Sequence, residues 1–475
     1  MFVETSGGFR LEQDALGTLE VPVSAYYGIH TLRALENFAV SGRLVNPHQI
    51  RAMVTVKKAA ALAHLKLNSY PPEIAIAIVQ TCNEIHAGGL AGQFVVDALQ
   101  GGAGTSTNMN VNEVVANRAV ELLGGVRGDY TVVHPLDHVN CCQSTNDVYP
   151  TALRIAAIGL LRKLSEACAS LQEALQEKEL KYAEVLKLGR TELMDALPVT
   201  AGQSFGAYAR AVQRDRWRLY KAEERLREIN IGGTAVGTGM NAPVKYTFYM
   251  TELLQELTGF GLARSDFPMD GTQNMDVFTE VSGLLKAAAV NLLKISGDLR
   301  LLASGPAGGL GELKLPPVQA GSSIMPGKVN PVMAEMLGTA AMRVIANDTA
   351  VTMASGSGQL ELNAFLPLIA DALLDSLELL QRAVTHFTER CVRGIIVNGD
   401  RCTELLERSG VYAAAFISHI GYDKSAEAAT RAMEEGKTIR QVLLDSGLLP
   451  GEKVEQILNP NQLTKPGIPG KGRDQ

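Results

Sequence analysis

The chain has 475 residues, of which 46% are hydrophobic, and carries a net charge of −6. This length is enough for two or three domains and a large buried core. The acidic balance argues against a general polyanion binder, so we expect no nucleic-acid partner. Many tracts are rich in alanine and leucine, and aromatic residues make up only 5% of the chain. This composition favours a mainly α-helical fold over a β-sandwich.

The cysteines and the first residues of the chain indicate the cellular compartment. No cysteine belongs to a CxxC pair, and two adjacent cysteines are poorly placed for a structural disulfide. We therefore expect reduced thiols and a cytoplasmic protein. The first eight residues lack a basic stretch followed by an apolar one, and no apolar run reaches about 18 residues, so we expect neither a secretory signal nor a membrane span. The six cysteines are Cys82, Cys141, Cys142, Cys168, Cys391 and Cys402.

Helices are expected along most of the chain after an irregular start. Residues 1–45 show only short extended pieces, around Leu19–Pro22, and a turn at Tyr26–Gly28. Apolar periodicity and stop signals then predict helices one after another. Their expected ranges are about 47–67, 72–87, from the segment 101–110 to about 123, 151–180, 201–229, 246–258, 275–303, 332–353 and 358–394, followed by 399–409, 413–417, 424–436, 438–446 and 452–458. We expect a bend at Pro367 and a loose tail after the last helix.

These helices suggest three domains. We predict a mostly helical N-terminal domain over 1–141, a central long-helix domain over 142–397 and a small helical domain over 398–475. Helices of about 28 residues are roughly 40 Å long at 1.5 Å per residue. Their Ala/Leu/Val faces imply bundling, with the bundle shared between subunits.

The densest polar stretch is Gly321–Pro331, which carries two serines, a lysine and an asparagine between glycines and prolines. It follows the glycine-rich stretch Ser304–Gly311 and lies between helical tracts. Glycine and proline here disfavour both helix and strand. We interpret the region as a mobile lid that carries chemical groups, with an ordinary surface connection as the alternative.

Similar polar segments occur at Gly101–Asn110, Gln143–Thr151, Gly189–Pro198 and Ile231–Asn241. The first two precede predicted helices, where Ser, Thr or Asn would cap the helix and backbone N–H groups would favour an anion. A plain helix cap is the alternative. His134 and His138 have the spacing of a metal pair, but the sequence around them predicts extended chain and supplies no further ligands, so we expect no metal.

The side chains of these segments suit a small dicarboxylate or amino-acid substrate, because neutral donors and one ammonium can hold carboxylate oxygens. Neither a nucleophile elbow nor a dinucleotide fingerprint is present, so we expect no cofactor. Such binding fits β-elimination, in which the substrate carboxylate takes up the charge of the carbanion. Ser322 would act as base in its alkoxide form, close to Lys328. The collected residues are Thr105, Ser106, Ser144, Thr145, Asn146, Thr191, Glu192, Ser322, Ser323, Lys328 and Asn330.

Over nearly its whole length the chain resembles the aspartase/fumarase superfamily. Gly321–Pro331 is similar to the signature loop of that superfamily, and Gly102–Asn110, Gln143–Asp147 and Gly189–Asp195 to its other site segments. The resemblance implies a mainly helical, three-domain subunit with a twenty-helix bundle in a homotetramer, each site being built from three subunits. It also implies that Ser322 is the catalytic base and that Glu335 matches a glutamate near Lys328. The residues implied to hold the substrate are Thr105, Ser144, Thr145, Asn146, Thr191, Ser323, Lys328 and Asn330.

The aspartate ammonia-lyase branch is the one that the chain resembles at Thr145, the Tyr26–Gly28 start and Val332-Met333. This resemblance implies reversible loss of ammonia from L-aspartate to give fumarate.

Two residues depart from the family pattern: Glu192, where His or Gln is usual, and Ala307, where the lid usually carries Arg. Glu192 would contact an ammonium or a larger amine, or else pair with Arg190 or stay protonated. The alternatives are a fumarase-type hydratase, a lyase for an N-substituted aspartate, and a non-catalytic, crystallin-like relative.

Overall fold

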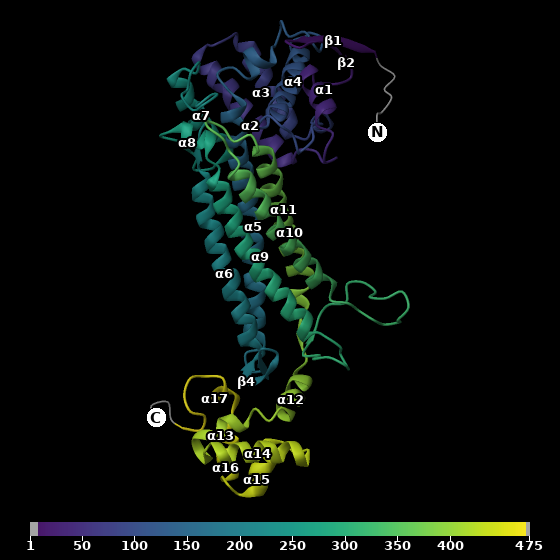
Figure 1. The fold of residues 1–475 in the computed structure, drawn as a ribbon, viewed down its shortest axis with the longest axis vertical. Coiled ribbons are helices and arrows are strands. Elements are labelled where there is room, and N and C mark those ends of the chain that lie inside the picture. Colours follow the sequence, from purple (N-terminus) through teal and green to yellow (C-terminus); the bar gives the residue numbers. More distant parts are fainter. Residues whose placement is uncertain (1–7, 472–475) are drawn as a thin grey trace. The chain divides into compact units, whose positions relative to one another are not determined.

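The computed structural model describes residues 8–471, and these residues are mainly helical, as expected (Figure 1). They divide into two compact units. Unit 1 takes the chain up to Ser165, Trp217–Ala289 and Met342–Gln381, and unit 2 takes Glu166–Arg216, Val290–Ala341 and the chain from Arg382 onward. No described helix has the length and apolar character needed to cross a membrane.

The N-terminal part of unit 1 is more regular than expected. Strand β1 (Phe9–Asp14) pairs antiparallel with β2 (Gly17–Pro22), and α1 (Ile29–Asn37) follows. Strand β2 confirms the extended piece expected around Leu19–Pro22, whereas β1 and α1 were not predicted. Residues 1–7 lie outside the described chain. The Arg10 guanidinium holds the segment after β2 by donating hydrogen bonds to the carbonyls of Pro22, Ala25 and Tyr27. This contact joins residues distant in sequence, so local patterns could not reveal it.

The next helices begin and end where their capping residues predict. Helix α2 (Pro47–Leu67) has Asn46 as its N-cap, and Asn68 ends it in the left-handed conformation. Helix α3 (Pro72–His86) begins with a proline at its first position, where no N–H donor is needed. Helix α4 (Thr105–Leu122) follows Gly104, so the expected Ser/Thr/Asn cap was wrong.

Five long helices contribute to both units: α5 (Thr145–Lys181), α6 (Ala201–Leu226), α9 (Asp276–Leu302), α10 (Val332–Ser355) and α11 (Leu366–Arg390). Two boundaries differ from the prediction. Helix α5 begins six residues earlier than expected, with Pro150 near its start. Helix α11 begins at Leu366, which puts Pro367 in its first turn rather than at a bend. A proline is tolerated in a first turn because the N–H it lacks has no helical partner there.

Buried polar contacts join these helices inside unit 1. Asp348 of α10 accepts hydrogen bonds from Ser282 and Lys286 of α9. Asn347 of α10 donates to Asp375 and to Ser376 of α11. Polar contacts of this kind fix the register of helices whose apolar faces alone would allow sliding. Unit 1 is completed by α7 (Val244–Thr258), α8 (Pro268–Gln273) and the short parallel pair β5 (Glu228–Ile229) and β6 (Ala263–Arg264).

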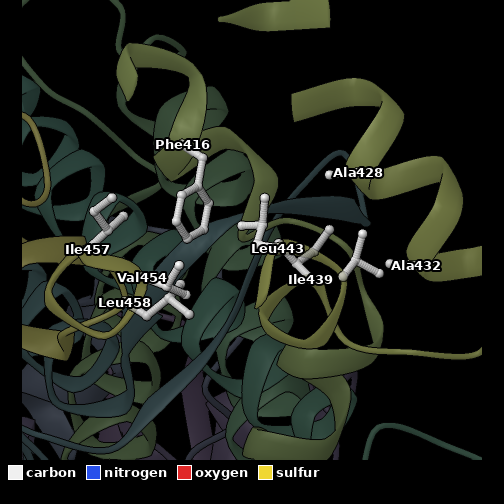
Figure 2. Close-up of a cluster of buried hydrophobic side chains, with 9 residues drawn as sticks. Phe416, Ala428, Ala432, Ile439, Leu443, Val454, Ile457 and Leu458 are labelled. Atoms are coloured by element: carbon white, nitrogen blue, oxygen red, sulfur yellow. The ribbon is translucent and has the colours of Figure 1, made fainter. Parts of the chain in front are cut away.

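Unit 2 contains the C-terminal helices, which have a core of their own. Figure 2 shows Phe416 with apolar side chains such as Leu443 and Val454, all buried. The helices are α12 (Gly399–Arg408), α13 (Ala413–Ile420), α14 (Tyr422–Glu435), α15 (Ile439–Ser446), α16 (Gly451–Ile457) and α17 (Pro460–Leu463). The tail was expected to be loose, but as far as Lys471 it is held, since the Pro469 carbonyl lies 2.7 Å from His419 Nε2.

Two small sheets complete unit 2. The polar segment Gly189–Pro198 forms a hairpin of β3 (Leu186–Thr191) and β4 (Met194–Thr200), which the sequence did not indicate. Strand β7 (Leu313–Lys314) pairs with β8 (Ile396–Val397). The hairpin turn consists of Glu192 and Leu193, both with positive φ. Such turns favour glycine and asparagine, so this pair gives no recognisable hairpin signal.

Candidate active site

In unit 1 the structure brings together the polar N-termini of α4 and α5. Gly104 has φ of +94° and packs so closely on Tyr149 that an added Cβ would lie 2.2 Å from the ring. Asn108 of α4 donates to Thr145 Oγ1 at 3.2 Å. These contacts place Thr105, the exposed first residue of α4, on the same face of unit 1 as the start of α5, where Ser144, Thr145 and Asn146 lie.

Asp147 organises the start of α5. Its carboxylate is fully buried and accepts hydrogen bonds from the backbone N–H groups of Ser144 at 2.9 Å, Gly232 at 3.0 Å and Thr234 at 3.1 Å. Asn146 also donates to the carbonyl of Ala235 at 2.7 Å. The glycine-rich turn Ile231–Asn241 therefore serves as a backbone cradle for the residues that follow Ser144.

A lysine that sequence reasoning treated only as a helix former lies beside these residues. Lys57 of α2 is fully buried, and its ammonium donates to Asn140 Oδ1 at 2.8 Å and to Gln143 Oε1 at 2.9 Å. Burial lowers the pKa of Lys57 to about 7, and the charge of Asp147 opposes that shift. Burial likewise raises the pKa of Asp147 to about 6. In the sequence, only the helical periodicity of α2 could have indicated that the side chain of Lys57 is buried.

In unit 2, Thr191 and Glu192 lie at the exposed tip of the β3–β4 hairpin. Of the alternatives for Glu192, pairing with Arg190 is not found, because Arg190 Nη2 instead donates to the fully buried Glu312 at 2.9 Å. Lys187 Nζ lies 3.1 Å from the same carboxylate. Glu312 adjoins β7, so this ion triad fixes the base of the hairpin and leaves Glu192 without an ion pair among the described residues.

The loop Gly321–Asn330 closes on itself. The N–H of Gly321 donates to the Lys328 carbonyl at 2.7 Å, and Asn330 Nδ2 donates back to the Gly321 carbonyl at 2.8 Å. Directly after this closure, Ser322 Oγ accepts hydrogen bonds from the N–H groups of Ile324 at 3.2 Å and Met325 at 3.0 Å. Lys328 is exposed, and a cavity of about 520 Å³ opens between Ser322, Lys328 and the preceding Pro317–Ala320.

We expect Asn330→Ala to loosen this loop. The variant loses one of the two hydrogen bonds that close it, and a bond of this kind contributes about 0.5–1.5 kcal/mol. Hydrogen exchange of the loop amides, measured by mass spectrometry, should rise about two- to twelvefold. Gln319→Ala, an exposed neighbour, should leave exchange unchanged. Equal exchange in both variants would show that Asn330 does not hold the loop.

The predicted site residues thus form two groups, and neither unit by itself contains all of them. Unit 1 holds Thr105, Ser144, Thr145 and Asn146, and unit 2 holds Thr191, Glu192, Ser322, Ser323, Lys328, Asn330 and Glu335. Glu335, in the first turn of α10, lies 3.6 Å from the Arg300 guanidinium.

His134 and His138 both use their Nδ1 atoms in hydrogen bonds within their own segment. Residues Pro135–Val139 form a short π-helix rather than extended chain. His134 Nδ1 caps it by accepting from Leu136 and Asp137, while His138 Nδ1 accepts from the His134 N–H at 2.8 Å. The six cysteines are all free, in agreement with the prediction of reduced thiols.

A family model described as a lyase matches residues 17–346, and one described as the fumarase C C-terminus matches residues 413–465. The chain belongs to the aspartase/fumarase superfamily. The resemblance predicted from the sequence is thereby confirmed. Among curated relatives of this superfamily, aspartate ammonia-lyase from Bacillus subtilis (strain 168) is 44% identical over 463 residues, which cover 98% of each chain. The enzyme of the same name from Pseudomonas aeruginosa is 46% identical, over 97% of this chain and 98% of its own.

Solved structures of the superfamily confirm the fold. A fumarate lyase:delta crystallin from Brucella melitensis, solved with bound cobalt, has a TM-score of 0.93 and 47% identity, and the match covers 96% of this chain and 100% of that one. Class II fumarase from Schistosoma mansoni has a TM-score of 0.91 and 34% identity, with 96% of this chain and 99% of that one covered. Superfamily members with different described activities thus share this fold. The substrate must therefore be inferred from the site residues and not from the fold.

Proposed function

We propose that the protein is a carbon–nitrogen lyase that reversibly eliminates ammonia from L-aspartate to give fumarate. The observation that carries this proposal is the identity of 43–46% with curated relatives named aspartate ammonia-lyase, over at least 97% of the chain. The class II fumarase structure is more distant, at 34%. Thr145 at the start of α5 also favours the aspartase branch, as predicted from the sequence.

We propose Ser322 as the base that removes a proton from the carbon next to a substrate carboxylate. The contacts of Ser322 Oγ support this role, because two backbone N–H groups already donate to it. Donors of this kind stabilise an alkoxide more than a hydroxyl and so favour loss of the serine proton. Lys328 supplies positive charge for the dianionic aci-carboxylate that forms as the proton leaves.

The remaining site residues would hold the substrate carboxylates and the leaving amine. Hydroxyls and amides suit this task, since they donate to carboxylate oxygens without changing charge. Their interactions strengthen as charge accumulates on the aci-carboxylate, and only such differential binding speeds the reaction. We assign this role to Thr105, Ser144, Thr145, Asn146, Thr191, Glu192, Ser323 and Asn330, with Glu335 near Lys328.

We further propose a cytoplasmic homotetramer in which segments of three subunits complete each site, on a three-domain subunit. One observation supports assembly. Large apolar side chains on the long helices of unit 1 are exposed, Trp217 by 63% and Met353 by 68%. An oligomer that packs long helices from several chains would bury such side chains.

A substrate panel tests the proposal. Purified protein incubated with L-aspartate should release fumarate, measured by ultraviolet absorbance, whereas L-malate should give little or no fumarate. Strong turnover of malate and none of aspartate would instead establish a hydratase. Turnover of neither would favour a non-catalytic relative.

A lyase for an N-substituted aspartate is a second candidate. Glu192, at the exposed hairpin tip and without an ion pair among the described residues, is available to an ammonium group larger than that of aspartate. Adding primary amines to fumarate tests this candidate. Faster consumption of fumarate with a substituted amine than with ammonia would favour it over the leading proposal.

A further inference from the structure

Three metal-ligating side chains meet in unit 1, on elements that lead into the candidate active site. Ligand atoms of His64, Cys141 and Cys142 all lie within 4.8 Å of one another. His64 is fully buried in α2, and the two cysteines, half-buried, precede Ser144. Cys142 has φ of +58°, in the left-handed region. Adjacent residues in extended chain point to opposite sides, so this turn lets the two thiols face one another.

The spacing of the two sulfurs suits ligands of a single ion. Their Sγ atoms are 3.8 Å apart. Two thiolates, each about 2.3 Å from a tetrahedral zinc ion, are separated by about 3.8 Å. A disulfide would need about 2.05 Å, so the sulfurs would have to approach one another considerably to become bonded. The geometry observed is that of a pair of ligands.

The ring of His64 is held by hydrogen bonds at both of its nitrogens. Nδ1 of His64 lies 3.0 Å from Ser69 Oγ, and Nε2 lies 3.1 Å from the Cys141 carbonyl oxygen. A carbonyl oxygen can only accept, so Nε2 carries the ring proton here and donates it to Cys141. An ion would bind the other tautomer, in which Nδ1–H donates to Ser69 Oγ and the lone pair of Nε2 is free for the metal. Nε2 is therefore the nitrogen that faces the cysteines.

Two buried hydroxyls beside the cluster lack a partner. The Tyr246 ring stacks on His64 with 4.9 Å between centroids, and the Tyr70 ring lies 5.2 Å away. Neither hydroxyl has a hydrogen-bond partner, and Tyr246 is fully buried. Unpaired buried hydroxyls are rare and costly. A water on the ion is a partner that would satisfy them, since three protein ligands leave a fourth tetrahedral position for water.

We propose that His64, Cys141 and Cys142 bind a zinc-type divalent cation, with a water molecule as the fourth ligand. Two thiolates and an imidazole select soft or borderline transition metals over magnesium and calcium, which prefer oxygen ligands. Binding deprotonates both thiols and releases their protons to solvent, without any change of oxidation state.

Binding has a consequence for the neighbouring segment. Cys142 is two residues before Ser144, and Gln143 Nε2, on the residue between them, donates to the Cys141 carbonyl at 3.3 Å. An ion held by both cysteines would fix the chain that leads into Ser144, Thr145 and Asn146. This consequence rests on the proposed function, whereas metal binding itself does not.

Cobalt(II) is the probe for this site, because its complexes with thiolates absorb in the near ultraviolet by charge transfer from sulfur. The full-length protein, freed of metal with a chelator and kept reduced without thiols, is titrated with Co²⁺. We expect one ion per chain, a sulfur charge-transfer band, and loss of that band when Zn²⁺ is added.

Variants assign the ligands. Cys141→Ser and Cys142→Ser should each weaken the band by about half and lower Co²⁺ affinity by at least about tenfold, and the double variant should abolish the band. His64→Gln should shift the visible bands and weaken binding while keeping the sulfur band. Cys168→Ala, which removes a buried thiol in unit 2, is the matched control and should match the parent protein.

A sulfur band that survives in the Cys141/Cys142 double variant, or that Cys168→Ala removes, would overturn the assignment. So would the absence of any band in a parent protein with native circular dichroism. Circular dichroism of each variant separates loss of ligand from loss of fold. These readouts do not depend on turnover, so an inactive protein that binds Co²⁺ through the two cysteines would refute the lyase and leave the metal site standing.

Discussion

Ser322→Ala should lower kcat for L-aspartate by about 10²- to 10⁴-fold, the usual contribution of a positioned general base. The variant removes the only side-chain oxygen that accepts from the N–H groups of Ile324 and Met325. The loop should keep its shape, because the hydrogen bonds that close it come from Gly321, Lys328 and Asn330. Initial rates of fumarate formation at saturating aspartate measure the effect.

Ser357→Ala is the matched control for this experiment. Ser357 is exposed beyond the end of α10, and its hydroxyl donates to the Met353 carbonyl, so the change removes a serine outside the proposed site. Its kcat should equal that of the parent protein, and light scattering should give one mass for all three proteins. Full activity in Ser322→Ala would remove Ser322 as the base while leaving the family assignment intact.

Asp147→Ala should destabilise the protein by about 3–5 kcal/mol, because it leaves buried groups without their partner. The substitution removes the acceptor for the N–H groups of Ser144, Gly232 and Thr234. It also removes the negative charge that stabilises the buried ammonium of Lys57. Urea-induced unfolding at a fixed protein concentration measures the loss, since the proposed assembly would make stability depend on concentration.

Asp147→Asn is the companion variant. It keeps one oxygen acceptor but loses the charge, so its cost should be smaller than that of Asp147→Ala. A cost below about 1 kcal/mol for Asp147→Ala would mean that the cradle around residue 147 forms without its carboxylate.

Helix boundaries were predicted correctly where capping residues mark both ends of the helix. Asn46-Pro47 and Asn68 bound α2, and both of its ends were predicted. Where a terminus depends on distant residues, prediction failed. Helix α5 begins at Thr145 because Asp147 is held by backbone from the turn after residue 230, so Pro150 was mistaken for a boundary. The β3–β4 hairpin was missed because Glu192 and Leu193 adopt positive φ without being glycine or asparagine.

For the site, residue types along the chain indicated the chemistry but not the arrangement. Lys328 was found because a lysine two residues before an asparagine, bracketed by prolines, is unusual in a linker, and Ser322 because it is close to that lysine. Asn330 was predicted only as a substrate ligand, whereas it also closes the loop, a contact that depends on the backbone of Gly321. Lys57 and His64 were not predicted, since both look like ordinary positions on an alanine-rich helix, and burial alone distinguishes them.

The closed loop has a mechanical consequence. Its two ends are joined by hydrogen bonds within Gly321–Asn330, so Ser322 keeps its two amide donors whatever the loop as a whole does. If the loop Gly321–Asn330 swings, the chain would bend at flanking residues such as Pro316–Gln319 and Pro331. The Ser322 hydroxyl and the two amides that donate to it would then move together as one rigid body. In its proposed role as the base, Ser322 would reach the substrate with both amide donors already in place, and product release would leave those two hydrogen bonds intact.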